Sequence, residues 1–184
     1  MEAGISLFAE KGYASTSVRE IVARAGVSKP VLYYYFKNKE GIFRDILNWA
    51  AEKQRDLLKE ILETPATALD RFIDLYRRVY QGALEIPSLF KMIHNLIFGP
   101  PQGAPDYDLE QYHRRMLSSI KTIYEQGIAL NEVIETDSKE VAVLVLSVLD
   151  FCLHMDYINP ELLDPGRPER LLRLVFQGLN QRKP

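Results

Sequence analysis

Apolar residues recur at intervals of three and four along nearly the whole sequence, and this spacing is the feature that most constrains the fold. In the first segment Ile5, Phe8 and Ala9 fall on one face of a helix, and Gly12 follows where glycine commonly ends a helix. A half-buried strand requires alternation in steps of two, and few segments carry that pattern. The sequence therefore predicts an all-α fold.

Capping residues and helix breakers delimit the predicted helices. Ser17 and Glu20 have the spacing of a capping box, in which each side chain satisfies an orphan backbone donor of the first turn. Ser28 and Asn38 are expected to cap the next two helices, and Thr64, which precedes a proline, the one after them. About nine helices are expected, over approximately residues 1–11, 18–25, 29–35, 39–63, 65–86, 89–97, 108–126, 137–158 and 168–181.

Further expectations concern single residues in these helices. Leu32, Tyr35 and Phe36 are expected to face the interior from the helix over 29–35. Gly127 is expected to end the helix over 108–126, and Asp137 with Glu140 to cap the following one. The segment 98–106 is rich in proline and glycine and is expected to form a loop.

Composition limits the classes of protein to which this chain can belong. Its 184 residues, 47% of them hydrophobic, have room for one ordinary domain or for a small domain joined to a larger one. The single cysteine, Cys152, excludes an internal disulfide. The longest apolar run, residues 141–149, is shorter than the ~20 residues that a membrane span needs. We therefore expect a cytoplasmic protein with neither a leader nor a membrane span.

Motifs of catalytic and metal-binding sites are missing from the sequence. It contains no phosphate-binding glycine loop, no nucleophile elbow and no carboxylate constellation with a recognisable spacing. The three histidines, His94, His113 and His154, lack the spacing of metal ligands. We expect neither an enzyme nor a bound metal or cofactor.

The most specific pattern lies near the N-terminus, where two short helices are joined by a turn at Gly26. This is the pattern of a helix-turn-helix, in which the second helix enters the major groove of DNA. The outer face of that helix would carry lysine, proline, valine and tyrosine side chains, which can meet phosphates or base edges. Residues 1–50 carry a net charge of +2, and the remainder carries −4. The alternative is that the exposed tyrosines are surface residues of an ordinary three-helix domain.

Three runs at the N-terminus resemble a known family. Residues 7–13 (LFAEKGY), 16–21 (TSVREI) and 25–40 (AGVSKPVLYYYFKNKE) are similar to the DNA-binding domain of the tetracycline-repressor (TetR) family. The resemblance implies a helix-turn-helix DNA-binding domain over residues 1–47 and a helical effector-binding and dimerisation domain over residues 48–184. It also implies that phosphates, bases or sugars of DNA are approached by Ser17, Arg19, Lys29, Pro30, Val31, Tyr33, Tyr34, Tyr35 and Lys39.

Two departures from the family's pattern are visible. Family members usually begin several residues earlier, often with a basic stretch, whereas this sequence begins at Met1 inside the predicted first helix. Whether residues precede Met1 is therefore left open. The family often has two glycines in the turn before the eighth helix, and here Asn131 stands at the second position. Asparagine also tolerates a left-handed backbone, so we expect no change in the turn.

The stretch 141–149 is apolar around its whole circumference, which a helix at the surface of a monomer cannot tolerate. The last predicted helix is also crowded, because Leu171 and Leu174 lie beside the stripe that contains Leu172 and Phe176. We expect these two helices to pair with their copies in a second protomer, and the resemblance implies a four-helix dimer interface. The alternative is a central helix buried within a monomer.

The resemblance further implies that a small-molecule effector binds the C-terminal domain. An aromatic and methionine-rich set of residues suits an apolar or flat ligand, although each is also compatible with an ordinary core position. Asp150 and His154 are four residues apart on one helix, and they could pair with each other or hold a polar group of the ligand. The candidate effector-binding residues are Tyr76, Tyr80, Phe90, His94, Tyr112, Met116, Asp150 and His154.

Together with the resemblance, these features predict a ligand-responsive transcriptional regulator, most often a repressor in this family. Such a homodimer would bind a palindromic DNA operator with half-sites about 34 Å or more apart, and the effector would release it. The long helix that follows Asn38 would be the covalent lever between the two domains. The alternative is a helical ligand-binding or adaptor protein that keeps the helix-turn-helix as a scaffold.

Overall fold

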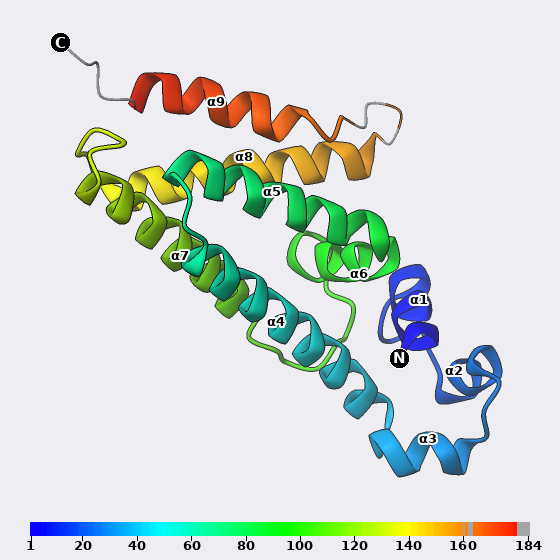
Figure 1. The fold of residues 1–184 in the computed structure, drawn as a ribbon. Coiled ribbons are helices and arrows are strands. Elements are labelled where there is room, and N and C mark those ends of the chain that lie inside the picture. The colour runs from blue at the N-terminus through cyan, green and yellow to red at the C-terminus, as the bar shows by residue number, and fades with distance from the viewer. Residues whose placement is uncertain (160, 162–163, 180–184) are drawn as a thin grey trace. The chain divides into compact units, whose positions relative to one another are not determined.

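The computed structural model describes residues 1–159, 161 and 164–179, with only the backbone of Leu179, and its regular elements are nine α-helices (Figure 1). The all-α prediction is confirmed. Residues 180 and 181, where the last predicted helix ends, lie outside the described residues. The helices are α1 (Glu2–Lys11), α2 (Val18–Ala25), α3 (Lys29–Phe36), α4 (Lys39–Glu63), α5 (Ala68–Glu85), α6 (Pro87–Phe98), α7 (Glu110–Ala129), α8 (Ser138–Ile158) and α9 (Arg167–Leu179).

The helices pack into two compact units. The first comprises residues 1–53 and 83–109, and the second comprises residues 54–82 and the described residues from 110 onward. Packing therefore adds α6 to the N-terminal helices, because Met92 of α6 is buried in one cluster with Ile5 and Phe8. The division expected between residues 47 and 48 places α6 with the C-terminal helices instead. The chain passes between the units three times, twice within α4 and α5, so α4 is not the single covalent link. The division into a DNA-binding and an effector-binding domain stays a prediction.

Local capping explains the short helices of the first unit. The Ser17 hydroxyl accepts from the Glu20 backbone N–H at 3.2 Å, and the Glu20 carboxylate accepts from the Ser17 backbone N–H at 2.9 Å. This confirms the capping box. Gly26 has φ 66°, the left-handed conformation that ends α2, and Asn38 accepts the backbone N–H of Gly41 at 2.7 Å. Ser28 lies at the N-cap of α3 without a side-chain capping bond.

The helix expected from Pro65 begins three residues later, at Ala68, as α5. Thr67 and Asp70 form the cap: the Thr67 hydroxyl donates to the Asp70 carboxylate at 2.7 Å and accepts the Asp70 backbone N–H at 3.2 Å. The Thr64 hydroxyl instead donates back to the Glu60 carbonyl oxygen at 2.8 Å, at the end of α4. The prediction was wrong because two threonines compete for the cap and the second has an acidic partner three residues on.

Gly127 does not end a helix as expected, since α7 continues to Ala129. A Cβ atom at this position would lie 2.9 Å from the Cβ of Ala68 and 3.3 Å from Cγ2 of Val133. The missing side chain therefore lets the start of α5 approach α7 closely. After α7 the chain turns through Asn131 at φ 57°, the left-handed conformation expected for it.

In the second unit, α8 packs between α7 and α9 (Figure 1). Val145 and Leu149 are buried, whereas Val143, Leu144 and Phe151 are 50%, 45% and 59% exposed. By length and composition α8 is long and apolar enough to cross a membrane, and 39% of its most apolar window is buried inside the fold. Within the described part of the chain, one side of this all-round apolar helix thus lies against the core and the other side faces outward.

We predict opposite effects on stability for alanine at two helical glycines. Gly127→Ala should lower the free energy of unfolding by about 1–3 kcal/mol, because its Cβ overpacks the contact with Ala68. Gly82→Ala is the control, since no atom lies within 4 Å of its Cβ position. It should raise the free energy of unfolding by about 0.5–1 kcal/mol, through helix propensity. Urea denaturation measures both values, and a stabilising Gly127→Ala would contradict the close contact.

Candidate nucleic-acid interface and effector site

The outer face of α3 carries most of the residues predicted to contact DNA. Leu32 is its buried residue, whereas Val31, Tyr33 and Tyr34 are 44%, 45% and 82% exposed. Lys29 and Pro30 at the start of the helix are exposed too, as are Ser17 and Arg19 at the start of α2. The structure thus presents a row of exposed aromatic and basic side chains on one short helix.

The structure places Tyr35 outside the buried stripe that was expected for α3. It was expected to face the interior with Leu32 and Phe36, but it is 69% exposed. Its ring lies 5.1 Å from that of Tyr34 in an edge-to-face arrangement. In an eight-residue helix the interior side is occupied by Leu32 and, partly, by Phe36 one turn later, which leaves Tyr35 outside. Its exposure agrees with the position that the resemblance implied for it.

In the first unit some charged side chains form ion pairs, and others have no partner of opposite charge among the described residues. Lys11 pairs with Glu20 at 2.6 Å, and pairs at 2.7 Å join Arg24 to Glu10 and Arg44 to Glu40. The Lys11 ammonium and the Ser17 N–H and O–H together lower the pKa of the Glu20 carboxyl to about 2. The remaining cations include Arg19, Lys29 and Lys37, which form no ion pair with any acid in the described part of the chain. Uncompensated positive charge is therefore concentrated on α2, α3 and the residue after α3.

Lys39 has a structural role that the sequence did not reveal. Its Nζ atom donates to the carbonyl oxygens of Tyr13 and Thr16, both at 2.9 Å, and lies 4.1 Å from the centre of the Tyr13 ring. These bonds hold the turn between α1 and α2, just before the capping residue Ser17. An ammonium group has three N–H donors, so one remains for the phosphate contact that was predicted for Lys39. That contact stays a prediction.

The segment between α6 and α7 also reaches the turn between α1 and α2. The carbonyl oxygen of Gln102 accepts the backbone N–H of Ala14 at 3.2 Å, and the Tyr107 hydroxyl donates to Asn48 at 3.0 Å. Ala104, Tyr107 and Leu109 pack against the core of the first unit. The sequence identified this segment as a loop but carried no periodic signal for where the loop would pack.

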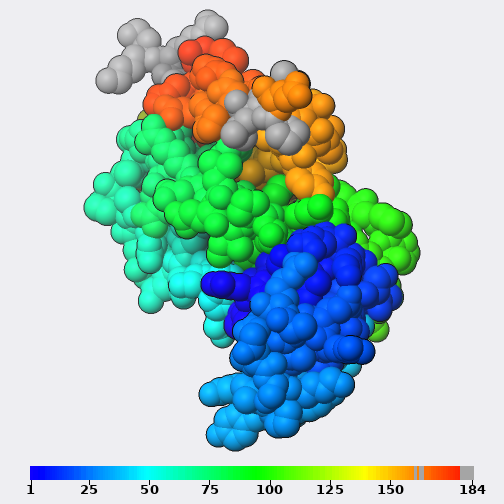
Figure 2. Space-filling view, turned by 90° about the vertical axis from the view of Figure 1, so that its right-hand side faces the viewer, coloured from blue at the N-terminus to red at the C-terminus, as the bar shows by residue number. Residues whose placement is uncertain are grey.

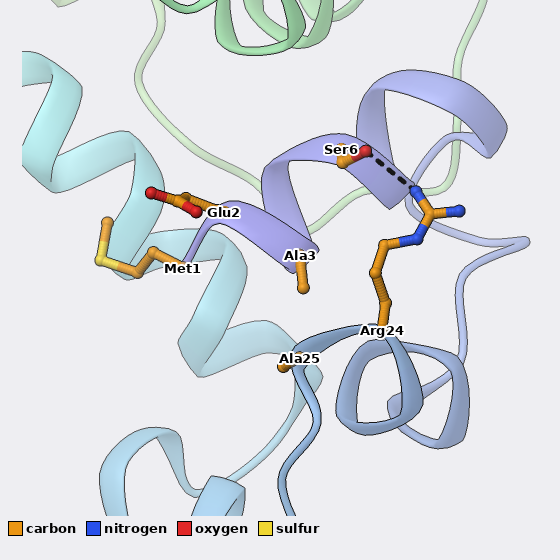
Figure 3. Close-up of a pocket in the computed structure, with 6 residues that line it drawn as sticks. All are labelled: Met1, Glu2, Ala3, Ser6, Arg24 and Ala25. Carbon is orange, nitrogen blue, oxygen red and sulfur yellow. Dashed lines mark hydrogen bonds between the residues drawn. The ribbon is translucent and has the colours of Figure 1, made fainter.

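An open hollow of about 610 Å³ lies between α1 and the end of α2 (Figure 3). The Arg24 guanidinium donates across it to the Ser6 hydroxyl at 2.9 Å and also binds Glu10. None of the residues predicted to bind DNA or an effector lines this hollow. We therefore assign it neither function. Its lining residues are Met1, Glu2, Ala3, Ser6, Arg24 and Ala25.

The predicted effector-binding residues are divided between the two units. Phe90 and His94 lie on α6 in the first unit, with their rings 5.9 Å apart, and the ring of Phe98 lies 5.0 Å from that of His94. The other six residues belong to the second unit. Of these, Tyr76 and Met116 are core residues, 2% and 1% exposed, and the Tyr76 hydroxyl donates to the carbonyl oxygen of Val145.

The structure gives Asp150 a different partner from the one that its helical spacing suggested. Its ion-pair partner is His113 on α7, with Nε2 3.6 Å from Oδ2, and not His154 on its own helix. Burial raises the pKa of the Asp150 carboxyl, and His113 offsets part of that rise. Burial also raises the pKa of the Tyr112 hydroxyl to about 12, with the charge of Asp150 adding to it. Sequence reasoning missed His113 because the partner lies on another helix, 37 positions away.

Two buried polar side-chain atoms of the second unit have no hydrogen-bond partner within the described chain. The Gln54 amide donates through Nε2 to the carbonyl oxygen of Tyr112 at 3.1 Å, which leaves its Oε1 unsatisfied. The hydroxyl of Tyr80 is unsatisfied as well. Gln54 carried no sequence signal, since nothing marked one glutamine of a long helix as buried. Among the described residues, no three His, Cys, Asp or Glu side chains are grouped to hold a metal ion.

Comparison with known proteins gives a family match at the N-terminus and curated relatives that match parts of the chain. Residues 1–46 match the model for "Bacterial regulatory proteins, tetR family". The HTH-type transcriptional repressor Rv3405c of Mycobacterium tuberculosis is 34% identical over 84 residues, which are 46% of this chain and 44% of that protein. The uncharacterized HTH-type transcriptional regulator YuxN of Bacillus subtilis is 33% identical over 95 residues, 50% of this chain and 32% of that protein. The matches therefore span less than half of these relatives.

Solved structures match along almost the whole chain. SmeT, in a complex with triclosan, has a TM-score of 0.78 at 20% identity, covering 98% of this chain and 89% of that one. The TetR family transcriptional regulator PfmR of Thermus thermophilus has a TM-score of 0.70 at 22% identity, covering 96% and 93%. These likenesses concern the fold. Residues 1–46 are therefore similar to the tetR family of bacterial regulatory proteins, and the fold along almost the whole chain is like that of these solved structures.

Proposed function

We propose that the protein is a ligand-responsive transcriptional regulator that represses its target genes by binding a palindromic operator as a homodimer. The observation that carries the proposal is the face of α3, where three consecutive tyrosines and Lys29 are exposed beside cations that lack an acidic partner in the described chain. Relatives named as transcriptional regulators and repressors support this function over that of an enzyme. A regulator of transcription acts on DNA in the cytoplasm of a bacterium, where we place it.

The geometry suits recognition of DNA by α3. In a helix-turn-helix the N-terminal part of the second helix contacts base edges, so Lys29, Pro30 and Val31 would enter the major groove first. Tyr34, the most exposed of the tyrosines, would reach bases or sugars. Arg19 and Lys37 would contact phosphates on either side and supply most of the salt-dependent affinity.

A second copy of the chain would cover the outward side of α8. Val143, Leu144 and Phe151 on this helix and Leu174 on α9 are 45–61% exposed, and the two helices lie side by side (Figure 1). An apolar face of this kind is stable in water when a partner covers it, and a twofold axis covers both copies at once. The same axis would place two α3 helices for a palindromic operator.

A small molecule bound in the second unit would control the affinity for DNA. SmeT is named in a complex with triclosan, and another structure of similar fold is named as a gamma-butyrolactone receptor, so members with this fold bind small molecules. Because α4 and α5 each continue from one unit into the other, a change in the second unit would reach the first through rigid helices. The resulting change in the free energy of DNA binding cannot exceed the difference in the ligand's binding free energy between the conformation that binds DNA and the one that does not.

The proposal is tested by footprinting, at two salt concentrations, on DNA that flanks the protein's own gene. We expect a protected near-palindrome that survives competitor DNA, with affinity falling steeply as salt rises. Tyr34→Ala should weaken operator binding by about 1–3 kcal/mol without changing the oligomeric state. A chain that protects no DNA, or a Tyr34→Ala variant with unchanged affinity, would favour a helical ligand-binding protein that keeps the helix-turn-helix as a scaffold.

Lys37 and Lys39 provide a matched pair of substitutions. Lys37→Met should leave stability unchanged and lower the slope of log affinity against log salt by about 1, because it removes one phosphate contact. Lys39→Met should lower the free energy of unfolding by about 1.5–3 kcal/mol, because it removes the bonds to the carbonyls of Tyr13 and Thr16. Thermal unfolding and DNA titration separate the two effects, and equal stability of both variants would contradict the anchoring role.

The dimer is tested by Leu174→Glu, which places a charge on the exposed apolar face of α9. We expect this variant to sediment as a folded monomer and to lose affinity for the palindrome while still binding DNA non-specifically. Lys59→Glu introduces the same charge at an exposed position of α4 and should remain dimeric. A Leu174→Glu variant that sediments as the unmodified chain does would rule out this interface.

A further inference from the structure

We propose that the cluster around Asp150 in the second unit binds an organic monocation with an aromatic or apolar body. The cluster consists of Gln54, Tyr112, His113 and Asp150. This inference rests on the proposed function, because it assigns a chemical class to the effector of that regulator. Its argument comes from the charge of Asp150 and from the unsatisfied polar atoms of the second unit.

The charge of Asp150 lacks a full counter-charge in the described chain. Its nearest cationic group is His113 at 3.6 Å, and no lysine or arginine forms an ion pair with it there. Asp74 on α5 gives the contrast: its side chain is 39% exposed, close to the 38% of Asp150, yet Arg78 lies 3.1 Å away. A partly buried carboxylate with so weak a partner gains from any cation that enters its surroundings.

The neighbouring groups offer acceptors and ring faces. Because Nε2 of Gln54 is committed to the Tyr112 carbonyl, the orientation of the amide is fixed and Oε1 remains an acceptor. Tyr80 lies one turn beyond Tyr76 on the same face of α5, and Tyr76 binds α8 at Val145. Its buried, unsatisfied hydroxyl is a further hydrogen-bonding group within the second unit.

These features together select the sign of the ligand's charge. An anion would meet the carboxylate of Asp150 and the acceptor oxygen of Gln54, and both would repel it. A cation is attracted by Asp150, by acceptor oxygens and by the faces of tyrosine rings. The charge of Asp150 contributes to the raised pKa of the Tyr112 and Tyr76 hydroxyls, so both hydroxyls lie within electrostatic reach of the carboxylate. An aromatic or alkyl body would contact the rings while its charged head lies beside Asp150.

The full-length protein is titrated calorimetrically with phenyltrimethylammonium and with benzenesulfonate, two ions of similar shape and opposite charge. We expect saturable binding of the cation and none of the anion. Asp150→Asn should weaken cation binding about tenfold or more, whereas Asp74→Asn, with a side chain equally exposed, should change it less than about twofold. Circular dichroism verifies that both variants are folded.

The outcomes distinguish this proposal from the proposed function. Absence of cation binding, equal binding of the anion, or equal affinity in Asp150→Asn and the unmodified protein would overturn the cation site. A footprint retained in those cases leaves the regulator intact and refutes only its ligand class. Conversely, Asp150-dependent cation binding by a chain that protects no DNA would support the site and refute the regulator.

Discussion

The placement of α2 and α3, the helices that we propose to bind DNA, depends on the two hydrogen bonds from Lys39 to the carbonyl oxygens of Tyr13 and Thr16. Within the turn between α1 and α2 the Thr16 backbone N–H donates to the Tyr13 carbonyl oxygen, and the ammonium at the start of α4 adds two further bonds to carbonyl oxygens of the turn. Charged hydrogen bonds of this kind contribute more than neutral ones. Because Ser17 follows the turn directly and caps α2, the same bonds fix where α2 and then α3 begin.

The first unit is therefore more than a helix-turn-helix. The chain returns to it through α6, whose Met92 is buried with the residues of α1, and the loop after α6 binds the backbone of Ala14. The turn before α2 is thus held from α4 and from the segment that leads to α7. Any rearrangement in the second unit has three covalent routes to this turn, two of them continuous helices.

In both units, many surface charges are paired with an opposite charge within a few ångströms, and exposed pairs of this kind add little stability. The charges left without such a neighbour matter for binding: Arg19, Lys29 and Lys37 at the proposed DNA face, and Asp150 in the second unit with only a histidine beside it. The two sites at which we propose ligands therefore carry charges of opposite sign, which suit a DNA backbone in the first unit and an organic cation in the second.

The sequence by itself determined the all-α class, the order of the helices and most of their ends. Caps such as Ser17 with Glu20 and Asn38 with Gly41 involve residues within four positions of one another, so local pattern is sufficient for them. It also identified most of the exposed residues of α3, with Tyr35 as the exception.

Only the tertiary structure decided what Tyr35, Gly127 and Asp150 do. The depth of Tyr35 depends on which side of α3 meets the core, and the role of Gly127 depends on Ala68, which is distant in the sequence. The partner of Asp150 lies on another helix, as do the carbonyls that Lys39 binds. Each of these contacts joins elements that are remote along the chain. Helical periodicity carries no information about which faces of two distant helices will meet.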